Sequence, residues 1–128
     1  MPQNKQSGVA GNQFGRTTAP LIAREIGARM LGTKSNEAEL DGERIVIKCA
    51  RAGTLSVGVS YLMLKRIRRV LGAFEQSNGS FCIYSLTVAE YSKAMTPTRS
   101  KGPSAGKVGI VRRAVFETRG TQVATIYA

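Results

Sequence analysis

The dipeptide Asp41-Gly42 is the feature of this sequence that most constrains its fold. It separates two short strand-like runs, residues 37–40 and 43–50. Asp-Gly favours a type I′ turn, in which both central residues take positive φ, and this turn joins adjacent antiparallel strands. The pair therefore predicts a β-hairpin over residues 37–50. The second strand is rich in β-branched residues and nearly continuous in apolar character, which is typical of a central strand.

Side chains alternate between the two faces of a strand. In the second strand, one face is therefore expected to carry Arg44, Val46 and Lys48, and the other Ile45, Ile47 and Cys49.

Helical spacing predicts two main helices. The first is expected to begin at Thr17 or Thr18, with Pro20 in its first turn, and to end at Gly32. The second is expected over residues 59–74, with an apolar stripe formed by Val59, Met63, Ile67, Val70 and Phe74. The remaining predicted elements are a strand at 80–86, a helix from a Thr87 cap to Met95, a strand at 108–116 and a final strand at 121–127.

The chain is expected to form one domain, because 128 residues suffice for a single modest core. Residues 1–16 are polar and rich in glycine, and they predict a flexible N-terminal arm. Residues 17–128 predict a single α/β or α+β domain, in which a small mixed sheet is covered by two main helices.

The charge balance indicates a polyanionic partner. The sequence has 19 basic and eight acidic residues, a formal net charge of +11. Nucleic acid is the commonest partner for such a surface. The sequence contains no apolar stretch long enough to span a bilayer and no secretory signal, so we expect an intracellular, cytoplasmic protein, nucleoid-associated if bacterial. In that compartment Cys49 and Cys82 are expected to be reduced and buried.

The absence of histidine removes several kinds of chemistry. Ser-His-Asp and Cys-His catalysis both need an imidazole, and a structural zinc site needs more ligands than two cysteines supply. An enzyme built from this sequence would rely on carboxylates, Lys, Tyr, Ser or a hard metal ion.

Four of the eight acidic residues fall within the hairpin, at Glu37, Glu39, Asp41 and Glu43, and Lys48 follows. Carboxylates are the ligands that Mg²⁺ and Mn²⁺ prefer, and a nearby cation can stabilise charge during phosphodiester cleavage. One interpretation is therefore a metal site at Glu37 and Glu39, with Lys48 as a third catalytic residue. The other is a solvated acidic hairpin with a structural lysine.

The layout of residues 18–86 resembles the PD-(D/E)XK, or restriction-endonuclease-like, superfamily. A helix precedes the hairpin, Glu37 lies on its first strand and Lys48 on its second. The resemblance implies a nuclease-like fold, a first metal-binding acid at Glu37 and a catalytic lysine at Lys48. The second acid of the family would stand two residues before the lysine, where this sequence has Val46. The resemblance therefore implies a degenerate nuclease as readily as an active one.

Two groups of residues are candidates for binding backbone phosphates. The first is the basic cluster Lys65, Arg66, Arg68 and Arg69. The second is a Gly-Ser-rich loop with the basic residues after it, namely Arg99, Ser100, Lys101, Gly102, Ser104, Gly106, Lys107, Arg112 and Arg113. Backbone N–H groups of such a loop can point at one anion, although its spacing differs from that of a Walker A motif. The alternative is a surface connection without a ligand.

Three functions follow from these patterns. The first is a nucleic-acid-binding protein, with double-stranded DNA as the expected ligand, that contacts phosphates and carries no activity of its own. The second is a Mg²⁺- or Mn²⁺-dependent nuclease that uses Glu37, Glu39 and Lys48. The third is a basic interaction factor that docks an acidic protein or a nucleoprotein. A homodimer is compatible with each of them.

Overall fold

A mixed six-stranded sheet forms the centre of the computed structural model, which describes residues 5–32, 35–97 and 107–127, with side chains described from residue 14 onward. The order is β1-β2-β3-β5-β6-β9, and only β3 and β5 run parallel. The strands are β1 (Arg29–Met30), β2 (Glu37–Leu40), β3 (Glu43–Ala50), β5 (Arg69–Glu75), β6 (Phe81–Thr87) and β9 (Thr121–Ile126). The predicted mixed α/β fold is confirmed.

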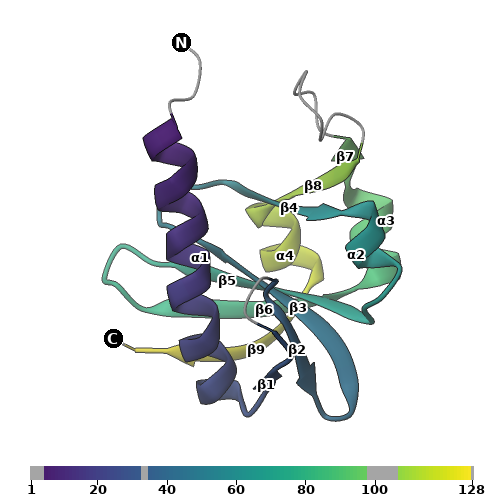
Figure 1. Ribbon diagram of the computed structural model, residues 1–128, viewed down its shortest axis with the longest axis horizontal. Helices are drawn as coiled ribbons and strands as arrows, with labels where there is room; N and C mark the ends of the chain where they lie inside the picture. Colours follow the sequence, from purple (N-terminus) through teal and green to yellow (C-terminus); the bar gives the residue numbers. More distant parts are fainter. Residues whose placement is uncertain (1–4, 33–34, 98–106, 128) are drawn as a thin grey trace.

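The two faces of this sheet are covered differently (Figure 1). The long helix α1 (Lys5–Ile26) packs on one face. The other face carries α2 (Tyr61–Leu64), α3 (Val88–Ala94), α4 (Arg113–Arg119) and a three-stranded antiparallel sheet of β4 (Ser56–Ser60), β8 (Val108–Arg112) and β7 (Thr96–Pro97). We call these the α1 face and the α2 face. None of the helices in the described ranges is both long and apolar enough to cross a membrane.

The predicted hairpin is confirmed, and it sets the orientation of the central strand. Asp41 has φ of 52° and Gly42 has φ of 81°, as a type I′ turn requires. Ile45 and Ile47 are fully buried on the α1 face, whereas Val46 is fully buried on the α2 face. Strand β3 is thus covered on both sides, which explains its nearly continuous apolar sequence.

Helix α1 begins and ends earlier than its sequence predicts. It starts at Lys5 rather than at Thr17 or Thr18, and it ends at Ile26 rather than near Gly32. Gly27 has φ of 80°, and the N–H of Ala28 donates to the carbonyl of Ala23 at 2.8 Å, which forms a glycine C-cap. The division into an arm at 1–16 and a domain at 17–128 stays a prediction.

The prediction of a second main helix over residues 59–74 is wrong. This segment contains the end of β4, the single turn of α2 and strand β5. The apolar stripe at helical spacing arises because β5 is buried on both faces, with Leu71 and Ala73 toward α1 and Val70 and Phe74 toward α2. A short apolar run of this kind does not distinguish a doubly covered strand from a buried helix.

The C-terminal half agrees better with the predictions. Thr87 caps α3, and Glu90 completes the capping box. The strand predicted over 108–116 ends at Arg112, and α4 begins at Arg113. The prediction is therefore wrong for residues 113–116. The final strand is confirmed as β9, which pairs with β6. Cys49 and Cys82 are partly buried and form no disulfide.

Candidate nucleic-acid interface and acidic hairpin

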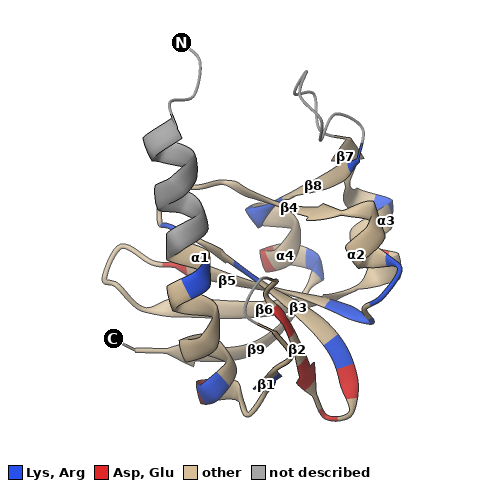
Figure 2. Ribbon diagram, in the orientation of Figure 1, with Lys and Arg blue, Asp and Glu red and all other residues tan. Residues whose placement is uncertain are grey.

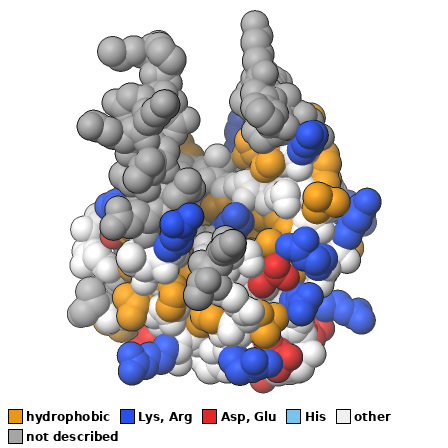
Figure 3. All heavy atoms as spheres, in the orientation of Figure 1, with side chains coloured by type: hydrophobic (Ala, Val, Ile, Leu, Met, Phe, Trp, Pro, Cys, Tyr) orange, Lys and Arg blue, Asp and Glu red, His pale blue; other side chains and the backbone are white. Residues whose placement is uncertain are grey.

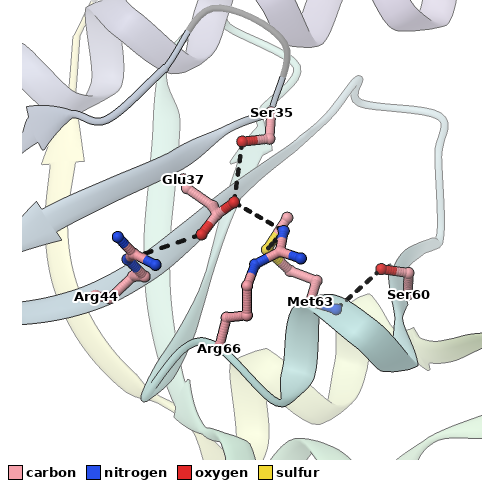
Figure 4. Close-up of polar contacts among 6 residues, drawn as sticks. All are labelled: Ser35, Glu37, Arg44, Ser60, Met63 and Arg66. Atoms are coloured by element: carbon pink, nitrogen blue, oxygen red, sulfur yellow. Dashed lines mark hydrogen bonds and ion pairs between the residues drawn. The ribbon is translucent and has the colours of Figure 1, made fainter.

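Glu37 is the most enclosed acidic side chain of the hairpin, with 12% of its side chain exposed. It lies on β2, opposite Val46, and points to the α2 face (Figure 4). Arg66 Nη2 donates to Glu37 Oε1 at 2.9 Å, and the Ser35 hydroxyl donates to the same oxygen at 3.2 Å. Arg44 Nε lies 3.9 Å from Glu37 Oε2. Both carboxylate oxygens therefore face cations or a hydroxyl donor.

The position of Arg66 depends on the short helix α2. Ser60 caps this helix by accepting a hydrogen bond from the N–H of Met63 at 3.1 Å. The N–H of Arg66 then donates to the carbonyl of Met63 at 2.9 Å, which turns its side chain toward β2. The hydrogen bond from Arg66 is the main reason why the pKa of Glu37 lies below its ordinary value. The pair therefore joins the acidic hairpin to the segment after α2.

Lys48 lies on the same face of the sheet as Glu37 but in a different environment. It is flanked along β3 by Val46 and Ala50, both in the apolar cluster of the α2 face, and it pairs with Gly72 of β5. Within the described part of the chain its ammonium group has no hydrogen bond or ion pair. Burial lowers the pKa of Lys48. Lys48 is thus a partly buried cation for which the described residues supply no carboxylate partner.

The other acids of the hairpin do not join Glu37. Glu39 shares its face but pairs with Arg29 of β1 at 3.4 Å in an exposed position. Asp41 belongs to the turn. Glu43 points to the α1 face and pairs with Arg69 at 3.0 Å. The register thus separates the acids that are close in sequence.

A divalent metal ion does not fit this arrangement. Mg²⁺ and Mn²⁺ need several oxygen ligands, and the two oxygens of Glu37 are engaged by Arg66, Arg44 and Ser35. Val46, opposite Glu37 on β3, is apolar and supplies no oxygen ligand. Among the described residues, no three His, Cys, Asp or Glu side chains are grouped to hold a metal ion. The predicted ligands Glu37 and Glu39 therefore lack the further oxygen donors that such an ion needs.

The first basic cluster spans the turn between α2 and β5 and the first residue of β5, and it does not lie on the helix face that its sequence predicts. Lys65 and Arg68 are exposed and have no side-chain partner in the described ranges. Arg66 and Arg69 are held by Glu37 and Glu43. Figure 2 shows basic segments along the stretch that leads from α2 into β5. We call residues 65–69 the basic turn.

The second group is only partly within the described ranges. Lys107 and Arg112 are exposed. Arg113 is engaged internally, since its side chain contacts Glu117 at 3.4 Å and the carbonyl of Glu75 at 3.4 Å, and its guanidinium lies 5.3 Å from the ring centre of Phe74. The other predicted residues, Arg99, Ser100, Lys101, Gly102, Ser104 and Gly106, lie outside the described residues.

The ion pairs of the described residues involve arginine alone, although Arg68 and Arg112 are among the arginines that have none. No ion pair with a described residue is formed by Lys48, Lys65, Lys93 or Lys107. Figure 3 shows several basic side chains along one edge of the molecule, with few acidic ones among them. Four of the acids thus form ion pairs within the protein, while a set of exposed cations has no acidic partner among the described residues.

The Glu37–Arg66 pair was not predicted from the sequence. Arg66 was expected to be a phosphate ligand, and its 29-residue separation from Glu37 gives no local pattern that links them. The parallel pairing of β3 and β5 brings the segment before β5 beside the hairpin. Only the sheet register reveals this contact.

Comparisons with known proteins identify no family. No protein-family model matches the sequence. No curated protein matches it either. Among solved structures, the chain is similar to Hjc, a Holliday junction resolvase from the archaeon Archaeoglobus fulgidus. The TM-score is 0.47 and the sequence identity is 13%, over 90% of this chain and 93% of that chain.

Proposed function

We propose that this protein binds nucleic acid, and double-stranded DNA in particular, mainly through backbone phosphates. The observation that carries the proposal is the basic turn, where Lys65 and Arg68 are exposed and form no ion pair with any described residue. The formal net charge of +11 supports it, because such an excess favours polyanions over other partners. Lys107 and Arg112 add exposed cations on the α2-face side of the molecule.

The two arginines of the basic turn have a positioning role in this proposal. Arg66 and Arg69 are anchored by Glu37 and Glu43, so they fix the backbone of the turn against the hairpin. A fixed turn presents Lys65 and Arg68 at a constant spacing. Phosphate contacts of this kind position a protein on nucleic acid without reading its base sequence.

Kinship with the restriction-endonuclease-like class is part of the proposal. It is supported by the order of α1, the β2–β3 hairpin and the parallel strand β5, and by the presence of Glu37 and Lys48 on one face of the sheet. Because the acids do not assemble around a metal ion, we propose a binding protein without cleavage activity.

One gel series tests the proposal. Purified protein is mixed with labelled duplex DNA or RNA at roughly 50 to 300 mM salt, a range over which phosphate contacts weaken strongly, with EDTA or Mn²⁺. The expected result is a salt-sensitive shift without cleavage products. Products that appear only with Mn²⁺ and disappear in Lys48→Ala would replace the proposal with the nuclease function. No shift in any lane would point to an acidic protein partner.

A further inference from the structure

A cavity of about 220 Å³ lies on the α1 face, between the hairpin turn and β9. Its apolar lining includes Ile45, Leu71 and Val123. Ile45 and Leu71 belong to the core cluster that α1 packs against, so the cavity borders that cluster. It is separated from Glu37 and Lys48, which lie on the opposite face of the sheet.

Ser85 also lines this cavity, and it is the unusual residue of the site. It lies on β6 between Leu71 of β5 and Thr121 of β9, and it is 5% exposed. Its hydroxyl is the one buried side-chain polar atom of the described residues that has no hydrogen-bond partner. A buried hydroxyl without a partner costs free energy that an alanine at this position would avoid. A ligand that bonds to it would remove this cost.

The rim of the cavity contains both donors and acceptors. Arg69 Nε donates to Glu43 Oε1 at 3.0 Å, and both side chains line the cavity together with Asp41. Two carboxylates and one guanidinium make this rim unfavourable for a phosphate group. A neutral ligand with its own donors and acceptors suits it better, because such a ligand can bond to the hydroxyl, the guanidinium and a carboxylate at once.

The volume limits the size of that ligand. An apolar cavity of about 150 Å³ is large enough to hold benzene. A cavity of about 220 Å³ can therefore hold one six-membered ring with small polar substituents. Aliphatic walls such as those of Ile45 and Leu71 suit the faces of a flat ring, while the polar groups can bond to its edge.

We propose that this cavity binds a pyrimidine ring, either as an unstacked base of a nucleic-acid strand or as a free nucleoside. The first source rests on the proposed function, since Arg69 joins the cavity to the basic turn and directly follows Arg68. Phosphates held at the basic turn would bring an unpaired nucleotide close to the cavity. Ser85 would then bond to the base edge.

Two binding arms distinguish the sources. In the first, binding is measured for a paired duplex, the same duplex with one bulged thymidine and the same duplex with an abasic site in place of the bulge. In the second, thymidine, uridine and cytidine are titrated by NMR, and the amide signals of β6 and β9 are followed. We expect the bulged thymidine to increase affinity about tenfold over the abasic duplex, as one hydrogen bond in a desolvated site would.

The variant Ser85→Ala provides the decisive comparison. It should be at least as stable as the wild type and retain its paired-duplex affinity, while it loses the preference for the bulged base. Val123→Phe, which adds bulk at the partly exposed rim, should have the same effect without touching the hydroxyl. Ser80→Ala is the matched control, because Ser80 is also buried but bonds to Asn78 outside the cavity.

Failure of this inference differs from failure of the proposed function. If the wild type binds all duplexes equally and no nucleoside shifts the signals of β6 and β9, the pyrimidine site is wrong although nucleic-acid binding stands. If no duplex binds but a nucleoside does, and Ser85→Ala abolishes that binding, the cavity is a nucleoside site and the proposed function is wrong. A preference for the bulge that persists in Ser85→Ala also overturns the inference.

Discussion

Glu37 and Lys48 lie on the same face of the sheet, but their charged groups have different surroundings. Glu37 is partly buried but has two guanidinium neighbours and a hydroxyl donor. Lys48, on the adjacent strand, has apolar neighbours and no carboxylate partner among the described residues. The surroundings of Glu37 stabilise the folded state, whereas burial of the charged Lys48 destabilises it. Locally unfavourable residues such as Lys48 are expected at functional sites.

Replacing Glu37 by Gln should lower the free energy of unfolding by about 1–2 kcal/mol at pH 7, because Arg66 and Arg44 lose their carboxylate. The folded-state pKa of Glu37 lies below its ordinary value of 4.5. Its contribution is therefore complete above that value and is lost as the pH falls through the folded-state pKa. Urea unfolding at pH 7 and in acid should show a loss in Glu37→Gln that shrinks in acid.

Glu39→Gln is the matched control. Glu39 lies on the same strand and face, but its pair with Arg29 is exposed, with 46% and 70% of the two side chains accessible. Its removal should cost less than about 0.5 kcal/mol. Equal losses in the two variants would show that enclosure by Arg66 does not stabilise Glu37.

Lys48→Met should stabilise the protein by about 1 kcal/mol at pH 7, because it replaces an unpaired, partly buried cation by an apolar side chain of similar length. Burial lowers the folded-state pKa of Lys48 below its ordinary value of 10.5. The penalty is therefore complete below the folded-state pKa and fades as the pH rises toward 10.5. The gain in unfolding free energy should disappear in alkaline solution; a destabilised variant would contradict this.

At the scale of elements, β5 decides the packing of the α2 face. Gly72 lies at its centre beside Lys48. A Cβ there would lie 2.6 Å from the ring of Phe74 and 3.1 Å from the ring of Phe116. These rings pack edge to face, with centroids 5.2 Å apart. The strand therefore needs a residue without a side chain at this position.

Gly72→Ala should destabilise the protein by about 2–3 kcal/mol, because the added methyl group overpacks the aromatic pair. Gly53→Ala is the control, since a Cβ at Gly53 meets nothing within 4 Å and its φ is not in the left-handed range. That change should be neutral or slightly stabilising. Urea midpoints of the two variants measure the difference, and a neutral Gly72→Ala would mean that Phe74 moves freely.

At the scale of the whole molecule, the distribution of charge matters more than its sum. Arg44, Arg66 and Arg69 are paired with acids, whereas Arg68 and the lysines of the described ranges are not. Planar guanidinium groups suit fixed pairs with carboxylates, and ammonium groups suit adaptable contacts with phosphates. Exposed cations lie on α1 as well as at the basic turn (Figure 2), and we expect binding at the basic turn because Lys65 and Arg68 lie close together there.

The double variant Lys65→Gln/Arg68→Gln should weaken duplex binding and reduce the slope of log affinity against log salt by about two, since each lost phosphate contact removes about 0.9. Arg16→Gln/Arg24→Gln removes the same charge from exposed positions on α1. It should leave that slope nearly unchanged. Similar slopes in both double variants would mean that binding follows net charge and not the basic turn.

The sequence by itself determined the elements whose signals are local. Asp41-Gly42 predicted the hairpin because only certain residues accept positive φ at two successive positions, and Thr87 with Glu90 predicted the start of α3 because a capping box spans four residues. The alternation along β3 was also readable, since it follows from strand geometry alone. The excess of positive charge follows from the composition alone.

Only the tertiary structure decided the features that depend on distant partners. The apolar pattern of β5 matched that of a helix, and only the structure shows that both faces of this segment are covered as a strand. The sequence indicated a metal ligand at Glu37, whereas in the folded sheet Glu37 pairs with Arg66. Glu43 lies on the opposite face of the sheet and pairs with Arg69. The cavity at Ser85 is formed by four segments of the chain, the β2–β3 hairpin, β5, β6 and β9. Burial and pairing are properties of the assembled sheet, so no local pattern encodes them.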